Sequence, residues 1–302
     1  MHLKKWEEKL QNLQNISTKV NNSKNILLID IMKLTKKIKF NISNALLNIN
    51  LINAIKEKYA IKNKLINDAN DKNKISKKLS NIFKSKSTLW IYLTEKQKYS
   101  TDSYSRYEKR LLEVVNAKKD DFIVIGERAL EFCKQNSFNV IKSFNEEQKA
   151  DRTLPWILSQ FVKILYINNN YSKVNFVLNT NKNYNSYFTI LPIDQFDVNK
   201  LVNEEETQNN KFDITNYKIY PGIEEFIENE INIFLENAIY SLIIESSFYN
   251  AKNDLVTTNK IINQIDEEIS KIKKKIVRTK RENEIEEIVL LTRSNEGFGG
   301  IK

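Results

Sequence analysis

The sequence has 302 residues, of which 41% are hydrophobic, and a formal net charge of +10 at pH 7. This apolar fraction can form a core and excludes disorder of the whole chain, while the positive charge suits a nucleic acid, a membrane surface or an acidic protein. Only 5 Gly and 3 Pro occur, which favours long uninterrupted helices. One cysteine, Cys133, excludes an internal disulfide. The chain has no run of ~20 apolar residues that could span a bilayer.

The first expected element is a long N-terminal helix within residues 1–83. Its apolar residues recur at steps of three and four, which is the spacing of a coiled-coil seam. The seam positions are Leu3, Trp6, Leu10, Leu13, Val20, Leu27, Ile31, Leu34 and Ile38, with polar Ser17 and Lys24 at two more. Polar residues 67–71 break the pattern, and residues 75–83 predict a short helix or a linker turn.

The period then changes. Apolar runs predict strands at 88–93, 121–126, 138–141, 173–178 and 186–191. Helical patterns lie between them at 106–117, 127–135 and 156–167. Strands that alternate with helices predict a Rossmann-like three-layer α/β domain with a mostly parallel sheet. Residues 199–215 are expected to form an exposed loop.

A second long helix is expected after Pro221-Gly222, because no Pro or Gly interrupts residues 223–296. Its densest apolar seam consists of Ile262, Ile265, Ile269, Ile272 and Ile276. Seams at opposite chain ends predict an antiparallel coiled coil of the two terminal helices. The predicted fold class is therefore α/β, with a coiled-coil helix and linker at 1–83, an inserted sandwich domain at 84–215, and a helix with a short tail at 216–302.

The sequence offers little catalytic chemistry. It contains no G-x-x-x-x-G-K-[ST] motif to cradle phosphates. The one histidine is His2, near a chain end, and the one cysteine lies in an apolar stretch, so neither a metal site nor a histidine-paired nucleophile is expected. No cofactor and no catalytic residue is predicted.

Basic residues gather late in the second helix, at Lys271, Lys273, Lys274, Lys275, Arg278, Lys280 and Arg281. One interpretation is a solvated helix face with pairs such as Lys280–Glu284. The other is a docking surface for acidic loops of a partner. The seam weakens at the same place, because polar Thr279 and Asn283 follow Ile276 at seam spacing. An apolar pattern restarts in a shifted frame at Ile285, Ile288 and Val289.

Several stretches resemble, in the same order along the chain, the gamma subunit of F-type rotary ATPases. They are LQNLQN (10–15), IVIGERALEF (123–132), ILPI (190–193), YKIYPGIEEFI (217–227), LENAIYSLIIES (235–246) and EIEEIV (284–289). The family's GLCGGYN motif is absent, since residues 94–107 are rich in Lys, Tyr and Ser. NDLVTT (253–258) and KKIVRTKR (274–281) also depart from the family pattern. These departures favour a diverged paralogue, such as the F-type-like ATPase of mycoplasmas linked to gliding.

The resemblance implies a non-catalytic central rotor shaft. Such a shaft couples ATP hydrolysis or synthesis in a surrounding ring of alpha-like and beta-like subunits to rotation. It further implies an epsilon-like or membrane rotor subunit as a partner, and a cytoplasmic complex at the inner face of the cell membrane. The family places this part of the last helix inside the ring, which implies ring contacts at Lys274, Lys275, Arg278, Arg281 and Glu287.

The alternative is a basic coiled-coil protein that binds nucleic acid or acts as a scaffold. The charge and the basic helix favour it, but no RRM, KH or helix-turn-helix signature is present. Salt separates the two, because binding to nucleic acid by counterion release weakens steeply as salt rises. The rotor interpretation expects no nucleic-acid partner.

Overall fold

The computed structural model describes residues 2–59, 61, 63–66, 87–98, 102–146, 153–169, 171–182, 187–197, 201 and 217–296. The chain divides into two compact units, which are described separately. The first unit joins Met1–Asp30 to Ala251–Lys302, and the second unit is Ile31–Asn250.

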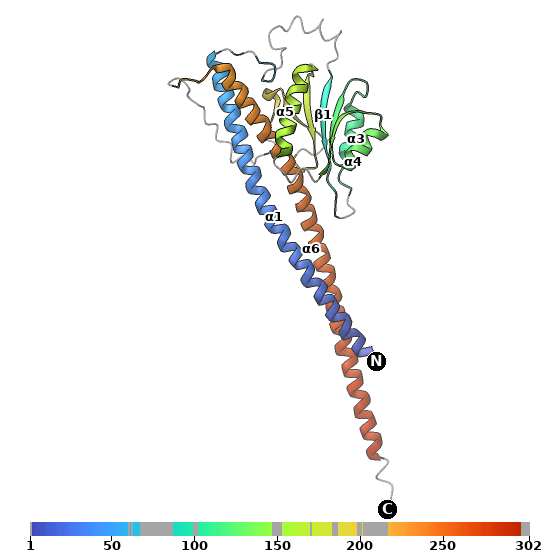
Figure 1. The fold of residues 1–302 in the computed structure, drawn as a ribbon. Coiled ribbons are helices and arrows are strands. Elements are labelled where there is room, and N and C mark those ends of the chain that lie inside the picture. Colours follow the sequence, from blue (N-terminus) through green and yellow to red (C-terminus); the bar gives the residue numbers. More distant parts are fainter. Residues whose placement is uncertain are drawn as a thin grey trace, which may run out of the picture. The chain divides into compact units, whose positions relative to one another are not determined.

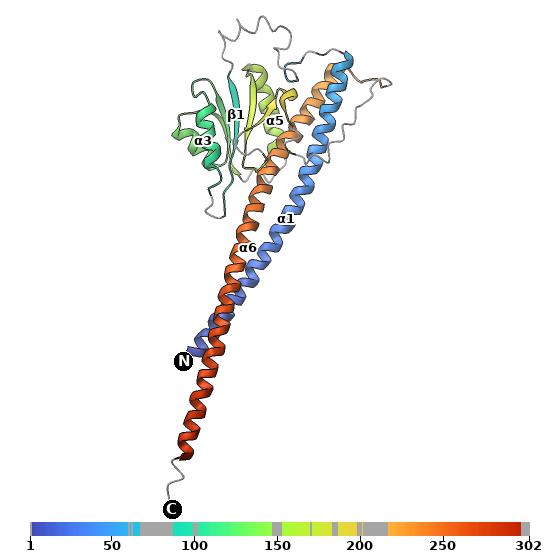
Figure 2. The same cartoon turned by 180° about the vertical axis from the view of Figure 1, so that it is seen from behind.

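Two long helices, α1 (His2–Tyr59) and α6 (Ile223–Glu296), form the terminal parts of the chain. In the first unit they lie side by side and run in opposite directions (Figures 1 and 2). The Glu7 carboxylate there lies 3.4 Å from the Lys280 ammonium. In the second unit the two helices also touch, where the Asn48 side chain donates a hydrogen bond to Glu230. The predicted antiparallel pairing of the terminal helices is confirmed.

Helix α1 ends at Tyr59, before the polar break that the sequence predicted at residues 67–71. The chain instead forms a turn in which the Asn63 Oδ1 accepts a hydrogen bond from the Leu65 N–H at 2.9 Å. The Leu65 carbonyl then accepts one from the Ile193 N–H at 2.9 Å. Backbone pairing with the segment after the last strand therefore replaces further helix. The predicted short helix at 75–83 lies outside the described residues.

The second unit contains a five-stranded sheet. Its strands are β1 (Thr88–Leu93), β2 (Asp121–Ile125), β3 (Asn139–Phe144), β4 (Lys173–Val177) and β5 (Phe188–Leu191). The spatial order is β3-β2-β1-β4-β5. The three pairings among β3, β2, β1 and β4 are parallel, and β5 pairs antiparallel to β4. The mostly parallel sheet is thus confirmed.

The other helices are α3 (Ser105–Val114), α4 (Glu127–Gln135), α5 (Thr153–Asn168) and the short 3-10 helix η2 (Ile193–Gln195). Helix α3 stops before its predicted end at residue 117, because the Asp120 carboxylate accepts a hydrogen bond from the Asn116 N–H at 2.9 Å and draws the chain into a turn. Among the described helices, none is long and apolar enough to cross a membrane.

The sheet has a distinct core on each face, because successive strand residues point to opposite sides. Leu89, Ile91 and Leu93 belong to one buried cluster, together with residues of α5 and α6. Trp90 and Tyr92 belong to the other, together with residues of α3 and α4. Figure 1 shows α3 and α4 on the opposite side of the sheet from α5. The second unit is therefore a three-layer sandwich with α6 as part of one outer layer.

Candidate partner-binding surface on the helix pair

The seam between the two helices holds the residues that the heptad pattern singled out. In the first unit, Ile262, Ile272 and Ile276 of α6 are buried, and Ile265 and Ile269 are half-buried. The α1 residues Leu10, Leu13 and Leu27 are half-buried, as is Leu34 in the second unit. Polar Ser17 and Lys24 at the same frame are also half-buried. Burial of these apolar side chains stabilises the pair by the hydrophobic effect.

Near the N-terminal end of α1, two lysines lie over the ring of the seam residue Trp6. The Lys275 ammonium lies 4.7 Å from the centroid of the Trp6 ring, and the Lys9 ammonium lies 5.9 Å from it. A cation over an indole face is held by the ring quadrupole. Lys280 next to this cluster pairs with Glu7 of α1, in place of the expected pair with Glu284. Lys275 and Lys280 thus contribute to contacts between the helices.

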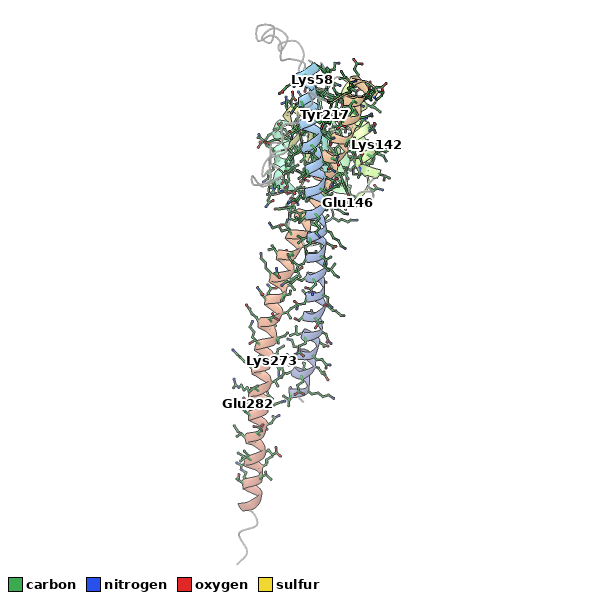
Figure 3. All side chains as sticks on the ribbon, turned by 90° about the vertical axis from the view of Figure 1, so that its left-hand side faces the viewer. Lys58, Lys142, Glu146, Tyr217, Lys273 and Glu282 are labelled. Atoms are coloured by element: carbon green, nitrogen blue, oxygen red, sulfur yellow. The ribbon has the colours of Figure 1, made fainter. Side chains whose placement is uncertain are left out.

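Helix α6 continues past this point without α1 beside it. Figure 3 shows Glu282 on the part of α6 that runs beyond the N-terminal end of α1. Every side chain from Lys280 to Arg293 is exposed. The exposed large apolar residues of this stretch are Ile285, Ile288, Val289, Leu290 and Leu291, and 43% to 67% of each is accessible. A lone helix with this many exposed apolar residues is typical of a surface that a partner covers.

Helix geometry places part of the predicted contact set on one face. At about 100° per residue, Lys274, Arg278 and Arg281 fall within an arc of roughly 60°. That arc lies roughly opposite to Ile272 and Ile276, so these three side chains point away from α1. Ile285 continues the same face.

The other two predicted contacts lie elsewhere. Lys275 covers Trp6, and Glu287 lies roughly 180° around the helix from Arg278. Sequence reasoning also missed neighbours of the basic face. A shallow hollow along it is lined by Lys273, Lys274, Val277, Arg278, Arg281, Glu282 and Ile285. The i,i+4 spacing of Val277, Arg281 and Ile285 could have revealed that apolar and basic residues share this surface.

The charges on this surface are only loosely held. The Arg278 Nε donates to Glu282 at 2.8 Å, and both side chains are largely exposed. Two to three turns earlier, a hydrogen bond from Lys271 lowers the pKa of the Glu268 carboxyl and raises the pKa of Lys271 itself. Exposed ion pairs of this kind contribute about 0–1 kcal/mol. A partner carboxylate could therefore replace Glu282 at Arg278 at little cost.

Side chains with metal-binding or nucleophilic chemistry are a second kind of candidate. In the ranges that the structure describes, no three His, Cys, Asp or Glu side chains gather to hold a metal ion. Burial raises the pKa of the Cys133 thiol to about 12, which keeps it protonated at neutral pH.

The sequence matches no protein-family model. It is 46% identical over 295 residues to the uncharacterized protein UU050 of Ureaplasma parvum serovar 3, covering 98% of this chain and 95% of that protein.

Among solved structures, the fold is similar to a chain of the Euglena gracilis mitochondrial ATP synthase (OSCP/F1/c-ring, rotational state 3), with a TM-score of 0.48 and 14% identity over 100% of this chain and 97% of that one. A rotor chain from the same source, in rotational state 1, gives a TM-score of 0.45 and 13% identity over 93% of this chain and 98% of that one. A third similar chain comes from the central stalk and c-ring of the Tetrahymena thermophila mitochondrial ATP synthase. Its TM-score is 0.42 and its sequence identity is 17%, and the match covers 78% of this chain and 99% of that one.

Fold and surface together define an α/β protein built on an antiparallel pair of terminal helices. The chain belongs to the same family as Ureaplasma parvum UU050.

Proposed function

We propose that the chain is the non-catalytic central shaft of an F-type-like rotary ATPase. The observation that carries the proposal is the stretch of α6 after Lys280, residues 281–293, which is helical, exposed on all sides and not paired with α1. A long helix of this kind is stabilised mainly by packing, so it requires a surrounding partner. The ordered sequence resemblance to gamma subunits indicates what that partner is, a ring of alpha-like and beta-like subunits.

The exposed helix is asymmetric, as a shaft must be. Lys274, Arg278 and Arg281 make one side basic, whereas Glu287 lies on the opposite side. A ring subunit therefore meets a different surface at each angle of the shaft. Differential contacts of this kind are what allow rotation and the states of catalytic sites to bias each other.

The finer parts of the proposal concern the complex. The departures from gamma motifs at residues 94–107, 253–258 and 274–281 favour a paralogous machine over a housekeeping ATP synthase. We extend the proposal to a motility ATPase of the kind that mycoplasmas use for gliding, peripheral to the inner face of the cell membrane. The α/β domain would then contact an epsilon-like or membrane rotor subunit or its replacement.

Copurification tests this function. The tagged full-length chain is expressed in the organism that produces it and purified at low and at high salt. Its partners are then identified by mass spectrometry. Two partners that carry P-loop motifs, in a complex that hydrolyses ATP while the isolated chain does not, are the expected result. Recovery of nucleic acid alone, lost steeply as salt rises, would instead favour the basic nucleic-acid-binding alternative.

A further inference from the structure

The carboxyl ends of β1 and β4 lie next to each other at the point where the strand order of the sheet reverses direction. From β1 the chain continues to β2 on one side, while β4 and β5 lie on the other side. In open α/β sheets, ligands bind in the crevice outside the strand ends at such a topological switch point. In a sheet of this kind, a ligand would be expected to contact the residues that follow β1 and β4.

On the β1 side, α6 contacts the residues that follow the strand. Glu95, shortly after β1, accepts a hydrogen bond from the Ser247 hydroxyl at 3.0 Å. Its other carboxylate oxygen accepts one from the Asn250 side-chain amide at 2.9 Å. Ser247 and Asn250, less than one turn apart on α6, thus both bind the residue Glu95 that follows β1.

The β4 side is held in the same way. The Asn179 side-chain amide donates to the Asn250 Oδ1 at 2.9 Å. The Thr180 hydroxyl donates to Glu245 of α6 at 2.8 Å, and Lys182 lies 3.5 Å from the other oxygen of that carboxylate. Asn179, Thr180 and Glu245 are buried, with at most 1% of any of them exposed. Hydrogen bonds between groups this deeply buried are costly to break, because the separated partners stay away from water.

The same loop is also tied to α3, on the other side of the sheet. Asn179 donates a second hydrogen bond, to the Ser103 hydroxyl at 2.6 Å. The Thr180 carbonyl accepts hydrogen bonds from Arg106 at 2.8 Å and from the Tyr107 hydroxyl at 2.6 Å. Asn179 therefore bridges the segment that enters α3 and the helix α6, which belong to opposite layers.

We infer that Asn179 and Asn250 form a lock that fixes the α/β domain at one position along α6, with the helix itself in the place of a ligand. The apolar core between α6 and the sheet favours contact, but it is not directional. Buried polar pairs set the register instead, because a shift of one residue along the helix would leave each of them unpaired. This inference concerns the chain alone and does not depend on whether it turns inside a ring.

Amide hydrogen exchange on the full-length chain tests the lock. Asn179→Ala removes the bridge, so residues 103–107 and 246–250 should both exchange faster, by roughly tenfold or more, although they lie in different elements. Asn175→Ala is the matched control. This asparagine lies in the same chain segment, is 2% exposed, and accepts a hydrogen bond from Thr189 of the neighbouring strand β5. The control should speed exchange in β4 and β5 and leave 103–107 and 246–250 unchanged.

A second variant approaches the lock from the helix. Asn250→Ala, at a half-buried site on α6, should speed exchange at residues 95–97 and 178–182 together. The inference is wrong if Asn179→Ala affects only its own loop, if Asn175→Ala gives the same pattern, or if Asn250→Ala leaves residues 178–182 unchanged. Because no partner is present in this experiment, either result leaves the proposed rotor function to its own test.

Discussion

The Glu7 carboxylate lies 3.4 Å from the Lys280 ammonium, and every described side chain that follows on α6 is exposed. This ion pair marks the place where α6 leaves its helical partner. Upstream of it, apolar residues face α1. Downstream of it, Ile285, Ile288 and Val289 fall on the opposite side of the helix. The part of α6 before Lys280 therefore contacts α1, whereas the part after it is free to contact a partner. Substitutions in each part can test the two contacts separately.

A matched pair of isoleucine substitutions distinguishes the two contacts. Ile272 is 2% exposed and Ile285 is 60% exposed. Ile272→Asn should lower the free energy of unfolding by about 2–4 kcal/mol, because it removes buried apolar surface and buries an amide. Ile285→Asn should change it by less than about 0.5 kcal/mol but should weaken binding to the proposed partner ring. Urea denaturation of the isolated chain and copurification of the partners measure the two effects. Equal stability losses would show that residues beyond Lys280 are packed within the chain.

The basic face of α6 can be reversed in charge. Arg278→Glu with Arg281→Glu should leave the melting temperature nearly unchanged, since exposed charges usually contribute no more than ~0.5 kcal/mol. If acidic groups of the ring hold these arginines, the double variant should assemble but couple hydrolysis to rotation poorly. Arg110→Glu is the control, because Arg110 is also exposed and also paired with a nearby glutamate, at 2.7 Å from Glu113. If the double variant turns with wild-type torque, the basic face does not contact the ring and is only solvated surface.

One carboxyl in the α/β domain gives a pH dependence. Burial works to raise the pKa of Asp102, but hydrogen bonds from Ser105 and Arg128 prevail and lower it to about 2. Because the folded-state pKa is depressed, this group stabilises the fold above its unfolded pKa of about 3.9 and loses that contribution as the pH falls towards 2. Urea midpoints measured from pH 5 to pH 2 should fall less steeply for Asp102→Asn than for the wild type. Parallel curves would show that Ser105 and Arg128 do not hold the carboxyl in solution.

The single thiol offers a chemical probe. Cys133 is fully buried, and burial raises its pKa to about 12. Only the thiolate reacts readily, so a disulfide reagent at pH 8 should not label the native chain within minutes but should label it at once in denaturant. Fast labelling of the native chain would mean that α4 opens readily from the sheet.

The sequence predicted the elements with strong patterns and missed those set by contacts between distant residues. The strand predicted from the apolar run at Thr88–Leu93 and the helix at Glu127–Gln135 are found as expected. For the end of α1, the sequence showed only the polar break at residues 67–71, because the turn after Tyr59 depends on the pairing of Leu65 and Ile66 with Ile193 and Asp194. No local signal marks a backbone pairing across more than a hundred residues.

The surface on α6 was only partly predictable for a similar reason. Spacing alone placed Arg278 and Arg281 on one face, with Lys274 and Lys275 one turn earlier. It could not show that Lys275 covers Trp6, because that contact joins the two ends of the chain. The grip of Asn179 and Asn250 was not predicted at all, since asparagines are common in this chain and nothing local distinguishes these two.

Rotation of single molecules tests the central claim most directly. The copurified complex is fixed through its ring, and a small gold particle is attached to the α/β domain at Lys134→Cys, an exposed site on α4, in a Cys133→Ser background. If the chain is the shaft, ATP should drive the particle in one direction through repeated discrete steps. Sustained hydrolysis of ATP by the labelled complex, with a particle that does not turn, would contradict the account.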